Sequence, residues 1–198
     1  MKRDEIIDFI TGMRSRDHVI FFYTGREEKY YVLFTYLKIG LEKGEAVAYV
    51  TSQQTPEQLR RAMQEYGIDV TRYEASGALK VIDYKGWYII GGGFDPEKTM
   101  ELWKKLVDES KRKGFKGLRV TGEMSCFFDY ELVEELIDYE NSLHRTLAIP
   151  MMAICAYDRA LFSRQAARTD SVDVLLSLMS AHTTAIVSGH IEGVVKTA

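Results

Sequence analysis

The feature of this sequence that most constrains its fold is a regular alternation between short, wholly apolar runs and longer segments with one apolar face. Residues 19–23 are apolar throughout, which is typical of a strand buried on both faces of a sheet. The next segment repeats apolar residues every three or four positions as far as Leu41, and Gly44 is suited to end the resulting helix. The same unit recurs along the chain, which predicts βαβ units and a mainly parallel sheet.

The whole chain divides in this way, without an internal repeat or a linker. The predicted strands are residues 19–23, 46–51, 78–84, 117–123, 149–157 and 184–187. The predicted helices lie between residues 24 and 44, 55 and 67, and 95 and 114, and over 132–143 and 172–179. Residues 1–16 are predicted to form an N-terminal helix packed outside the core, and residues 17–198 a single domain. We therefore expect a three-layer α/β/α sandwich with a mostly parallel sheet.

Charge and composition exclude several classes of protein. The net charge of −3 and the pI of about 5.9 give no basic surface, so direct nucleic-acid binding is not expected. The N-terminal residues lack the apolar core of a signal peptide, and no run reaches the roughly 18 apolar residues that span a bilayer. The two cysteines make neither a disulfide framework nor a zinc pattern. We expect a cytoplasmic protein without a membrane partner.

The ends of the predicted strands point to a binding site, because ligands of open parallel sheets lie outside the carboxyl ends of the strands. These ends and the loops after them are rich in aromatic, small and polar residues, the usual make-up of a small-molecule pocket. The candidate ligand-binding residues are Tyr23, Thr24, Trp87, Tyr88, Glu123, Ser125, Cys126 and Tyr157. Their apolar faces and few polar tips suit a small, weakly polar organic molecule better than a phosphate or a sugar.

Two features of this candidate pocket are open to a second interpretation. The loop 85–94 carries Trp87, Tyr88 and three consecutive glycines, which makes it a candidate lid. The alternative is that Trp87 fills the edge of the core, as buried tryptophans commonly do. Similarly, Cys126 and Cys155 either face one pocket or serve as small buried apolar side chains.

A nucleotide site would require a phosphate loop after the first strand, and the residues there do not form one. Lys29 is neither preceded by glycine nor followed by Ser or Thr, as the lysine of a P-loop is. Glu27 and Glu28 stand in the first turn of the predicted helix, where they interact with the helix dipole themselves and repel an anion. We therefore expect no ATP hydrolysis.

Other patterns for catalysis or metal binding are also missing from the sequence. Glu123 ends a predicted central strand, where a carboxylate can act as a base, bind a cation or a ligand, or accept hydrogen bonds from loop N–H groups. His18 precedes the first strand, at the end of the sheet away from the candidate pocket. The other histidines, His144, His182 and His190, share no metal-binding spacing, and no nucleophile elbow is present. The sequence therefore predicts no metal site, no cofactor and no enzymatic activity.

Several segments together resemble a known family. They are, in order, HVIFFY (18–23), GLEKGE (40–45), WY (87–88), FDP (94–96), LRVTGEMS (118–125), YE (139–140) and CAYD (155–158). The chain resembles the MEDS domain, the sensory domain of methanogens and methylotrophs that includes the DcmR-type regulators, from about residue 17 to about residue 190. The RVTGEMS segment, together with WY and FDP in this order, is the most specific part of the resemblance.

This resemblance implies a RecA/KaiC-like fold, similar to P-loop NTPases but without a functional P-loop. It also implies a sensory, ligand-binding role in signal transduction or transcriptional regulation, with hydrocarbon derivatives as the ligands. Such domains often stand beside a histidine kinase or a DNA-binding domain, so a separate histidine kinase or transcription regulator is a candidate partner. We also expect a homodimer, by analogy and from the apolar segment 185–187. The alternative function is a degenerate RecA-type nucleotide-binding protein or enzyme that uses Glu123.

Overall fold

Strands and helices alternate along the chain in the computed structural model, which describes residues 2–146, 150–165, 171–188 and 193–197. The strands of the main sheet are β1 (His18–Tyr23), β2 (Ala46–Thr51), β3 (Leu79–Asp83), β6 (Leu118–Glu123), β7 (Met152–Asp158), β8 (Thr184–Val187) and β9 (Gly193–Lys196). The helices are α1 (Lys2–Gly12), α2 (Arg26–Glu42), α3 (Pro56–Glu65), α4 (Val70–Ser76), α5 (Pro96–Arg112), α6 (Ser125–Asp129), α7 (Val133–Thr146), α8 (Arg159–Gln165) and α9 (Ser171–Ser180). Between β3 and α5 lie a 3-10 turn, η1 (Tyr84–Gly86), and a hairpin of β4 (Ile89–Ile90) and β5 (Gly93–Phe94).

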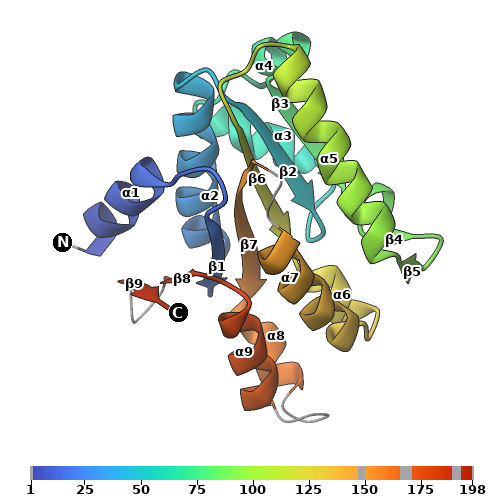
Figure 1. Ribbon diagram of the computed structural model, residues 1–198. Coiled ribbons are helices and arrows are strands. Elements are labelled where there is room, and N and C mark those ends of the chain that lie inside the picture. The colour runs from blue at the N-terminus through green and yellow to red at the C-terminus, as the bar shows by residue number, and fades with distance from the viewer. Residues whose placement is uncertain (1, 147–149, 166–170, 189–192, 198) are drawn as a thin grey trace.

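The main sheet has seven strands in the order β3-β2-β6-β7-β1-β8-β9, with helices on both faces (Figure 1). Its neighbouring strands run parallel except β8 and β9, which are antiparallel. The predicted three-layer α/β/α architecture with a mostly parallel sheet is confirmed.

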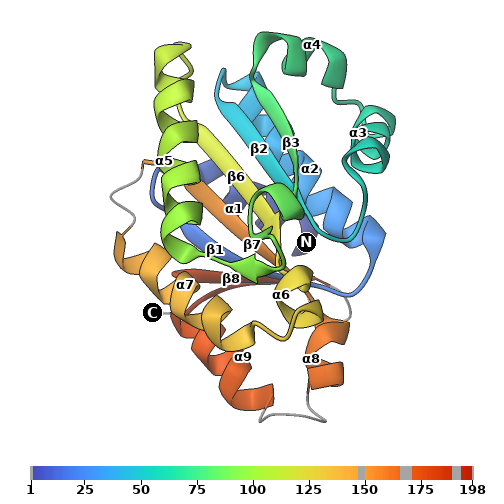
Figure 2. The same ribbon diagram turned by 90° about the vertical axis from the view of Figure 1, so that its right-hand side faces the viewer.

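Each face of the sheet is covered by its own set of helices, because successive side chains of a strand point to opposite faces. On one face, which we call the α2 face, Phe21 and Tyr49 belong to the core formed with α1, α2, α3 and α4. On the other, the α7 face, Phe22 and Val120 belong to the core formed with α5, α6, α7 and α9. Figure 2 looks onto the α7 face, with α5 and α7 in front of the sheet.

Two helices begin where the sequence predicts them, because side chains cap their first turns. The Thr55 hydroxyl accepts a hydrogen bond from the Gln58 N–H at 3.3 Å, and the Gln58 side chain accepts one from the Thr55 N–H at 3.1 Å. At the start of α5, the Asp95 carboxylate accepts a hydrogen bond from the Lys98 N–H at 3.0 Å. These caps fix the orientation of α3 and α5 as they leave the sheet edge.

The N-terminal helix is part of the core, so the expectation that it packs outside the core is wrong. Ile6 and Ile10 of α1 are 2% and 0% exposed and belong to the core of the α2 face. The guanidinium of Arg119, itself buried, donates a hydrogen bond to the Ile10 carbonyl at 3.0 Å. Within the described residues, no helix is both long enough and apolar enough to cross a membrane.

The C-terminal region differs from the prediction in its details. The apolar segment 185–187 lies in β8, between β1 and β9, where Ala185 and Ile186 are fully buried. Because only Val187 of this segment is partly exposed, the segment offers little surface for self-association, and the homodimer stays a prediction. The predicted strand 149–157 corresponds to β7, which begins at Met152, and Ile149 lies outside the described residues.

Candidate functional site

A cavity of about 490 Å³ opens at the carboxyl ends of the central strands, where open parallel sheets bind their ligands. We call it the strand-end cavity. Its lining comes from the β1–α2 turn (Tyr23, Thr24, Gly25, Arg26, Lys29), the segment after β2 (Ser52, Gln53, Gln54), α6 (Ser125, Asp129) and the end of β7 (Asp158). Side chains with hydrogen-bonding groups dominate this set, so the lining of the cavity is polar.

A buried ion pair lies at one side of this cavity and involves Glu123. One carboxylate oxygen of Glu123 accepts hydrogen bonds from the Lys29 ammonium at 2.7 Å and the Tyr49 hydroxyl at 2.8 Å. The other oxygen accepts from the backbone N–H groups of Ser52 and Gln53, both at 2.8 Å. The Glu123 side chain is fully buried and that of Lys29 is 3% exposed. Glu123 therefore ties α2 and the end of β2 to β6, one of the roles that the sequence left open.

The chain's own carboxylate occupies the place where a nucleotide-binding fold would hold phosphate. The Glu28 side chain accepts hydrogen bonds from the backbone N–H groups of Thr24 and Gly25 at 3.1 and 3.2 Å. It also accepts one from the Thr24 hydroxyl at 2.6 Å. Exposed N–H groups at such a turn normally attract anions. Here they are already paired, and the Lys29 ammonium is engaged by Glu123 and by the Gln53 amide oxygen at 2.8 Å.

The two tyrosines near this ion pair act as hydrogen-bond donors. Burial, followed by the nearby charges of Glu123 and Asp158, raises the pKa of Tyr23 far above its usual value. Burial and the Glu123 carboxylate raise the pKa of Tyr49 in the same direction. Both phenols therefore stay protonated at neutral pH. The Tyr23 hydroxyl donates to the Gln53 amide oxygen at 2.8 Å and helps to hold that side chain at the cavity.

The structure brings some of the predicted binding residues to the strand-end cavity. Tyr23, Thr24 and Ser125 line it, and Glu123 is buried beside it, in contact with the lining residue Lys29. The remaining four, Trp87, Tyr88, Cys126 and Tyr157, belong to the core of the α7 face. Whether any of the eight binds a ligand stays a prediction.

The division follows from the alternation of side chains along a strand. Glu123 is paired in register with Ala156, and the next residue of β7 is Tyr157. The side chain of Tyr157 therefore leaves the sheet on the face opposite to that of Glu123. Both residues end strands at the same edge of the sheet, but a whole layer of backbone separates their side chains.

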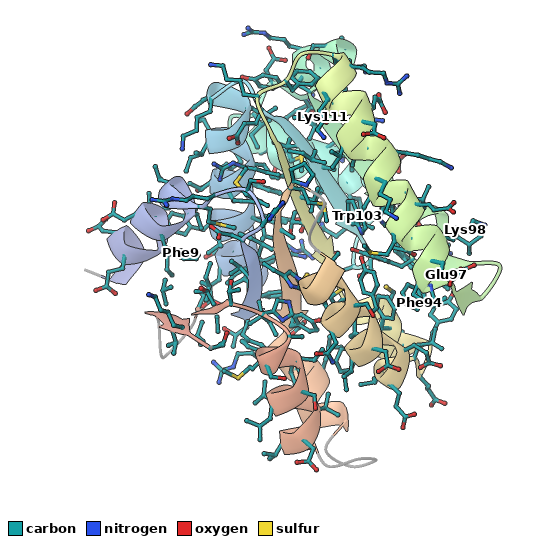
Figure 3. The ribbon with its side chains drawn as sticks, viewed as in Figure 1. Phe9, Phe94, Glu97, Lys98, Trp103 and Lys111 are labelled. Atoms are coloured by element: carbon teal, nitrogen blue, oxygen red, sulfur yellow. The ribbon has the colours of Figure 1, made fainter. Side chains whose placement is uncertain are left out.

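Trp87 and Tyr88 are packed as core residues in this structure. The Trp87 ring meets the Trp103 ring edge-on, with centroids 4.6 Å apart, and Figure 3 shows Trp103 on the side of α5 that faces the sheet. Tyr88 is 2% exposed, and its hydroxyl lies so close to Gly122 that a Cβ at that glycine would be 2.2 Å from the oxygen. This packing favours Trp87 as a filler of the core edge over its role in a lid.

Tyr157 and both cysteines are also deeply buried. The Tyr157 hydroxyl donates a hydrogen bond to the Glu140 carboxylate at 2.7 Å. Burial raises the pKa of the Cys126 thiol to about 12, so it is protonated and unreactive at neutral pH. Cys155 lies on the same face but beside Glu140, whose carboxylate accepts from its thiol at 3.6 Å. The two cysteines do not line the strand-end cavity.

A second cavity, of about 660 Å³, has a largely apolar lining, and we call it the apolar cavity. Its walls come from the end of β1, from α8, from α9 and from β8. They are Phe22, Thr24, Arg159, Ala160, Phe162, Leu175, Met179 and Val187. Thr24 lines both cavities, so the two lie on either side of the end of β1.

Sequence reasoning missed most of the polar lining. The eight predicted binding residues, half of which are aromatic, do not include Arg26, Gln53, Gln54, Asp129 or Asp158. A signal for three of them was present, since Gln53 and Gln54 lie just beyond Ser52 after the predicted strand 46–51, and Asp158 directly follows the predicted strand 149–157. The rule that ligands lie beyond the strand ends applies to every residue there, whatever its type.

Comparisons with known proteins agree with this geometry. Residues 17–176 match the family model MEDS, described as the methanogen/methylotroph, DcmR sensory domain. None of the curated proteins matches the sequence. Among solved structures, the flagellar accessory protein FlaH from Methanocaldococcus jannaschii has a TM-score of 0.59 and 15% identity, over 94% of this chain and 77% of that one. A KaiC-like protein from Pyrococcus horikoshii has a TM-score of 0.59 and 16% identity, over 87% and 71%. At such low identity the likeness shows the fold, which is RecA/KaiC-like.

Proposed function

Because the chain belongs to the MEDS family of sensory domains, we propose that it senses a small organic ligand bound in the strand-end cavity, without nucleotide chemistry. The observation that carries this proposal concerns the β1–α2 turn, where a nucleotide-binding fold would hold phosphate. The Thr24 and Gly25 N–H groups of this turn are hydrogen-bonded to the chain's own Glu28 carboxylate. The cavity lies where open parallel sheets bind their ligands, but the Thr24 and Gly25 N–H groups and the Lys29 ammonium, which could hold phosphate, are already paired within the chain. The other polar groups of the lining suit a ligand without phosphate.

The lining favours a small organic molecule that both donates and accepts hydrogen bonds. Gln53, Gln54 and Ser125 supply neutral donors and acceptors, and Arg26 supplies a cation. Asp129 and Asp158 add carboxylates that repel a phosphate. An alcohol, amine or amide derivative of a short hydrocarbon meets these requirements. It is more polar than the ligand that the aromatic residues of the sequence suggested.

The apolar cavity makes a less polar ligand the second candidate. Its volume of about 660 Å³ and its mainly apolar walls, with Arg159 and Thr24 as polar groups, match the usual composition of a small-molecule site. A halogenated or methylated hydrocarbon suits such walls, because burial of apolar surface supplies the binding energy.

The proposed output is contact with a partner protein, such as a separate histidine kinase or transcription regulator, or a second copy of the chain. Val172 and Leu176 on α9 are apolar and 58% and 57% exposed. The same helix lines the apolar cavity through Leu175 and Met179. If the ligand lies in the apolar cavity, the second candidate, it contacts α9 and would change the position of side chains on a surface suited to protein contact. No enzymatic step forms part of this proposal.

A thermal-shift screen with short alcohols, amines, amides and halogenated hydrocarbons tests the site. A ligand at a hundredfold excess over its Kd should stabilise the wild type by about 2.7 kcal/mol. Asp129→Trp fills the strand-end cavity from its exposed rim and should abolish the shift for polar ligands. Asp138→Trp places the same side chain at an exposed position of α7 that lines neither cavity, and should bind normally.

Met179→Trp fills the apolar cavity and separates the two candidates. If the strand-end cavity is the site, this variant keeps the shift that Asp129→Trp loses. If the thermal shift is lost only in Met179→Trp, the ligand binds in the apolar cavity and not in the strand-end cavity. A ligand that stabilises all three variants as well as the wild type would rule out both sites.

A further inference from the structure

Four side chains with metal-binding atoms converge in the core, outside the proposed ligand site. They are His18 at the start of β1, Glu140 of α7, Cys155 of β7 and His182 between α9 and β8. All four are at most 3% exposed, and one ligand atom from each lies within 4.8 Å of the others. Figure 2 shows α7 in front of the sheet, with α9 next to α7. The sequence positions are far apart, so only the fold unites them.

Four of the distances between these atoms are close to those of a tetrahedral metal site. Glu140 Oε2 lies 3.1 Å from His18 Nε2, 3.6 Å from His182 Nε2 and 3.6 Å from Cys155 Sγ. His18 Nε2 lies 3.3 Å from Cys155 Sγ. Bonds of about 2.0–2.3 Å from Zn²⁺ to nitrogen, oxygen and sulfur place tetrahedral ligands about 3.3–3.7 Å apart. All four atoms lie within 4.8 Å of one another, so one ion reaches all of them once the two histidine rings, whose centroids are 4.0 Å apart, move further apart.

The charges of these groups also fit a divalent cation. One thiolate and one carboxylate carry two negative charges, two neutral histidines carry none, and Zn²⁺ brings the total to zero. A neutral sum matters here because an uncompensated charge is costly to bury. The set of two histidines, one cysteine and one glutamate contains the ligand types that zinc prefers.

The groups around the cluster hold two of the ligands in the orientation that a metal requires. His182 Nδ1 lies 2.7 Å from the Leu178 carbonyl oxygen, which only accepts, so Nδ1 carries the hydrogen and Nε2 faces Glu140. The Tyr157 hydroxyl donates to Glu140 Oε1 at 2.7 Å and leaves Oε2 toward the two histidines and the thiol. Such outer contacts are the usual support of metal-binding histidines and carboxylates.

We propose that His18, Glu140, Cys155 and His182 form a closed Zn²⁺ site in the core of the α7 face. With four protein ligands the ion has no open coordination position, so its role is structural. It joins β1, β7 and α7 to the segment between α9 and β8. The ion would thereby fasten the C-terminal part of the domain, including the α9 surface, onto the sheet. This site is separate from both cavities and does not depend on the proposed function.

The test measures bound metal in the full chain, purified after growth with zinc, and its replacement by cobalt. We expect one zinc per chain. The two cysteines provide a matched pair of variants, since Cys126 is equally buried but lies outside the cluster. In Cys126→Ser, the cobalt protein should keep the thiolate-to-cobalt charge-transfer band, and with only two cysteines in the chain that band must come from Cys155. Cys155→Ser should lack the band.

Two further measurements separate metal binding from simple hydrogen bonding in the cluster. A chelator should lower the Tm of the wild type and Cys126→Ser but not that of Cys155→Ser. Tyr157→Phe removes only an outer contact and should weaken zinc binding by about 10- to 100-fold in competition with a chelator of known affinity. Folded wild type without bound zinc, or a cobalt spectrum of Cys126→Ser without a thiolate band, would overturn the proposal. The four residues would then be a hydrogen-bonded ion pair and its neighbours.

Discussion

Replacement of Lys29 by Met tests the buried ion pair at the strand-end cavity. The substitution removes the cation 2.7 Å from Glu123 while it keeps an unbranched side chain of similar length. Removing one partner of a buried pair typically costs about 3–5 kcal/mol, because the other charge stays buried without compensation. Glu123 keeps its hydrogen bonds from Tyr49, Ser52 and Gln53, so the cost should lie near the lower end, about 3 kcal/mol.

This cost is large enough to measure in a domain of this size. A loss of 3 kcal/mol corresponds to a Tm lowered by about 6–12 °C for a chain of 150–250 residues. Urea denaturation followed by circular dichroism gives the free energy of unfolding directly. Lys104→Met, at an exposed position of α5, is the matched control and should change the stability by less than about 0.5 kcal/mol.

A double variant distinguishes the ion pair from lost packing. Glu123→Gln removes the charge and keeps one acceptor oxygen for the neighbouring N–H groups. If the cost of Lys29→Met arises from an uncompensated carboxylate, the double variant is less destabilised than the sum of the two single variants. Strict additivity, or a Lys29→Met variant as stable as Lys104→Met, would refute the reasoning.

Three further predictions concern the core. Trp87→Ala should cost about 3–5 kcal/mol of stability in urea denaturation, since Trp87 packs against Trp103; unchanged stability would restore the lid. Burial raises the pKa of Tyr36, Tyr88 and Tyr139 above the usual 10.0. The three buried phenols therefore make their full contribution to the free energy of unfolding below pH 10.0. That contribution falls as the pH rises further, because the same tyrosines ionise at a lower pH in the unfolded chain than in the folded one. Absorbance titration should show the twelve tyrosines incompletely ionised while the fold persists, and full ionisation near pH 10.0 in the folded state would contradict this. The Cys126 thiol, with a pKa of about 12, should react with a thiol reagent only as fast as the protein opens.

The layers of the fold follow from local features of the sequence. The apolar run at 19–23 and the capping residues Thr55 and Asp95 each specify an element through short-range contacts. The short elements α6 and β9 could not be predicted, because short-range contacts alone do not specify them. Helix α6 has five residues and β9 pairs only with β8, so their formation depends on contacts that the fold supplies.

The candidate site was predicted less well because its position depends on which face of the sheet each side chain takes. The sequence placed Glu123 and Tyr157 at the same sheet edge, which is correct, but the register puts them on opposite faces. The cluster around Glu140 lay beyond sequence reasoning altogether. His18 and His182 come from opposite ends of the chain, and no spacing rule for metal ligands covers such a separation.

Equilibrium titration of the wild-type domain with ATP and Mg²⁺ tests most directly whether the chain's own carboxylates keep phosphate from binding at the β1–α2 turn. Glu28 pairs the N–H groups of Thr24 and Gly25, and Glu123 engages Lys29. We therefore expect no saturable binding tighter than about 1 mM and no hydrolysis. Micromolar binding of ATP, with Mg²⁺-dependent turnover that disappears in Glu123→Gln, would contradict the proposed ligand class and favour a nucleotide-binding enzyme.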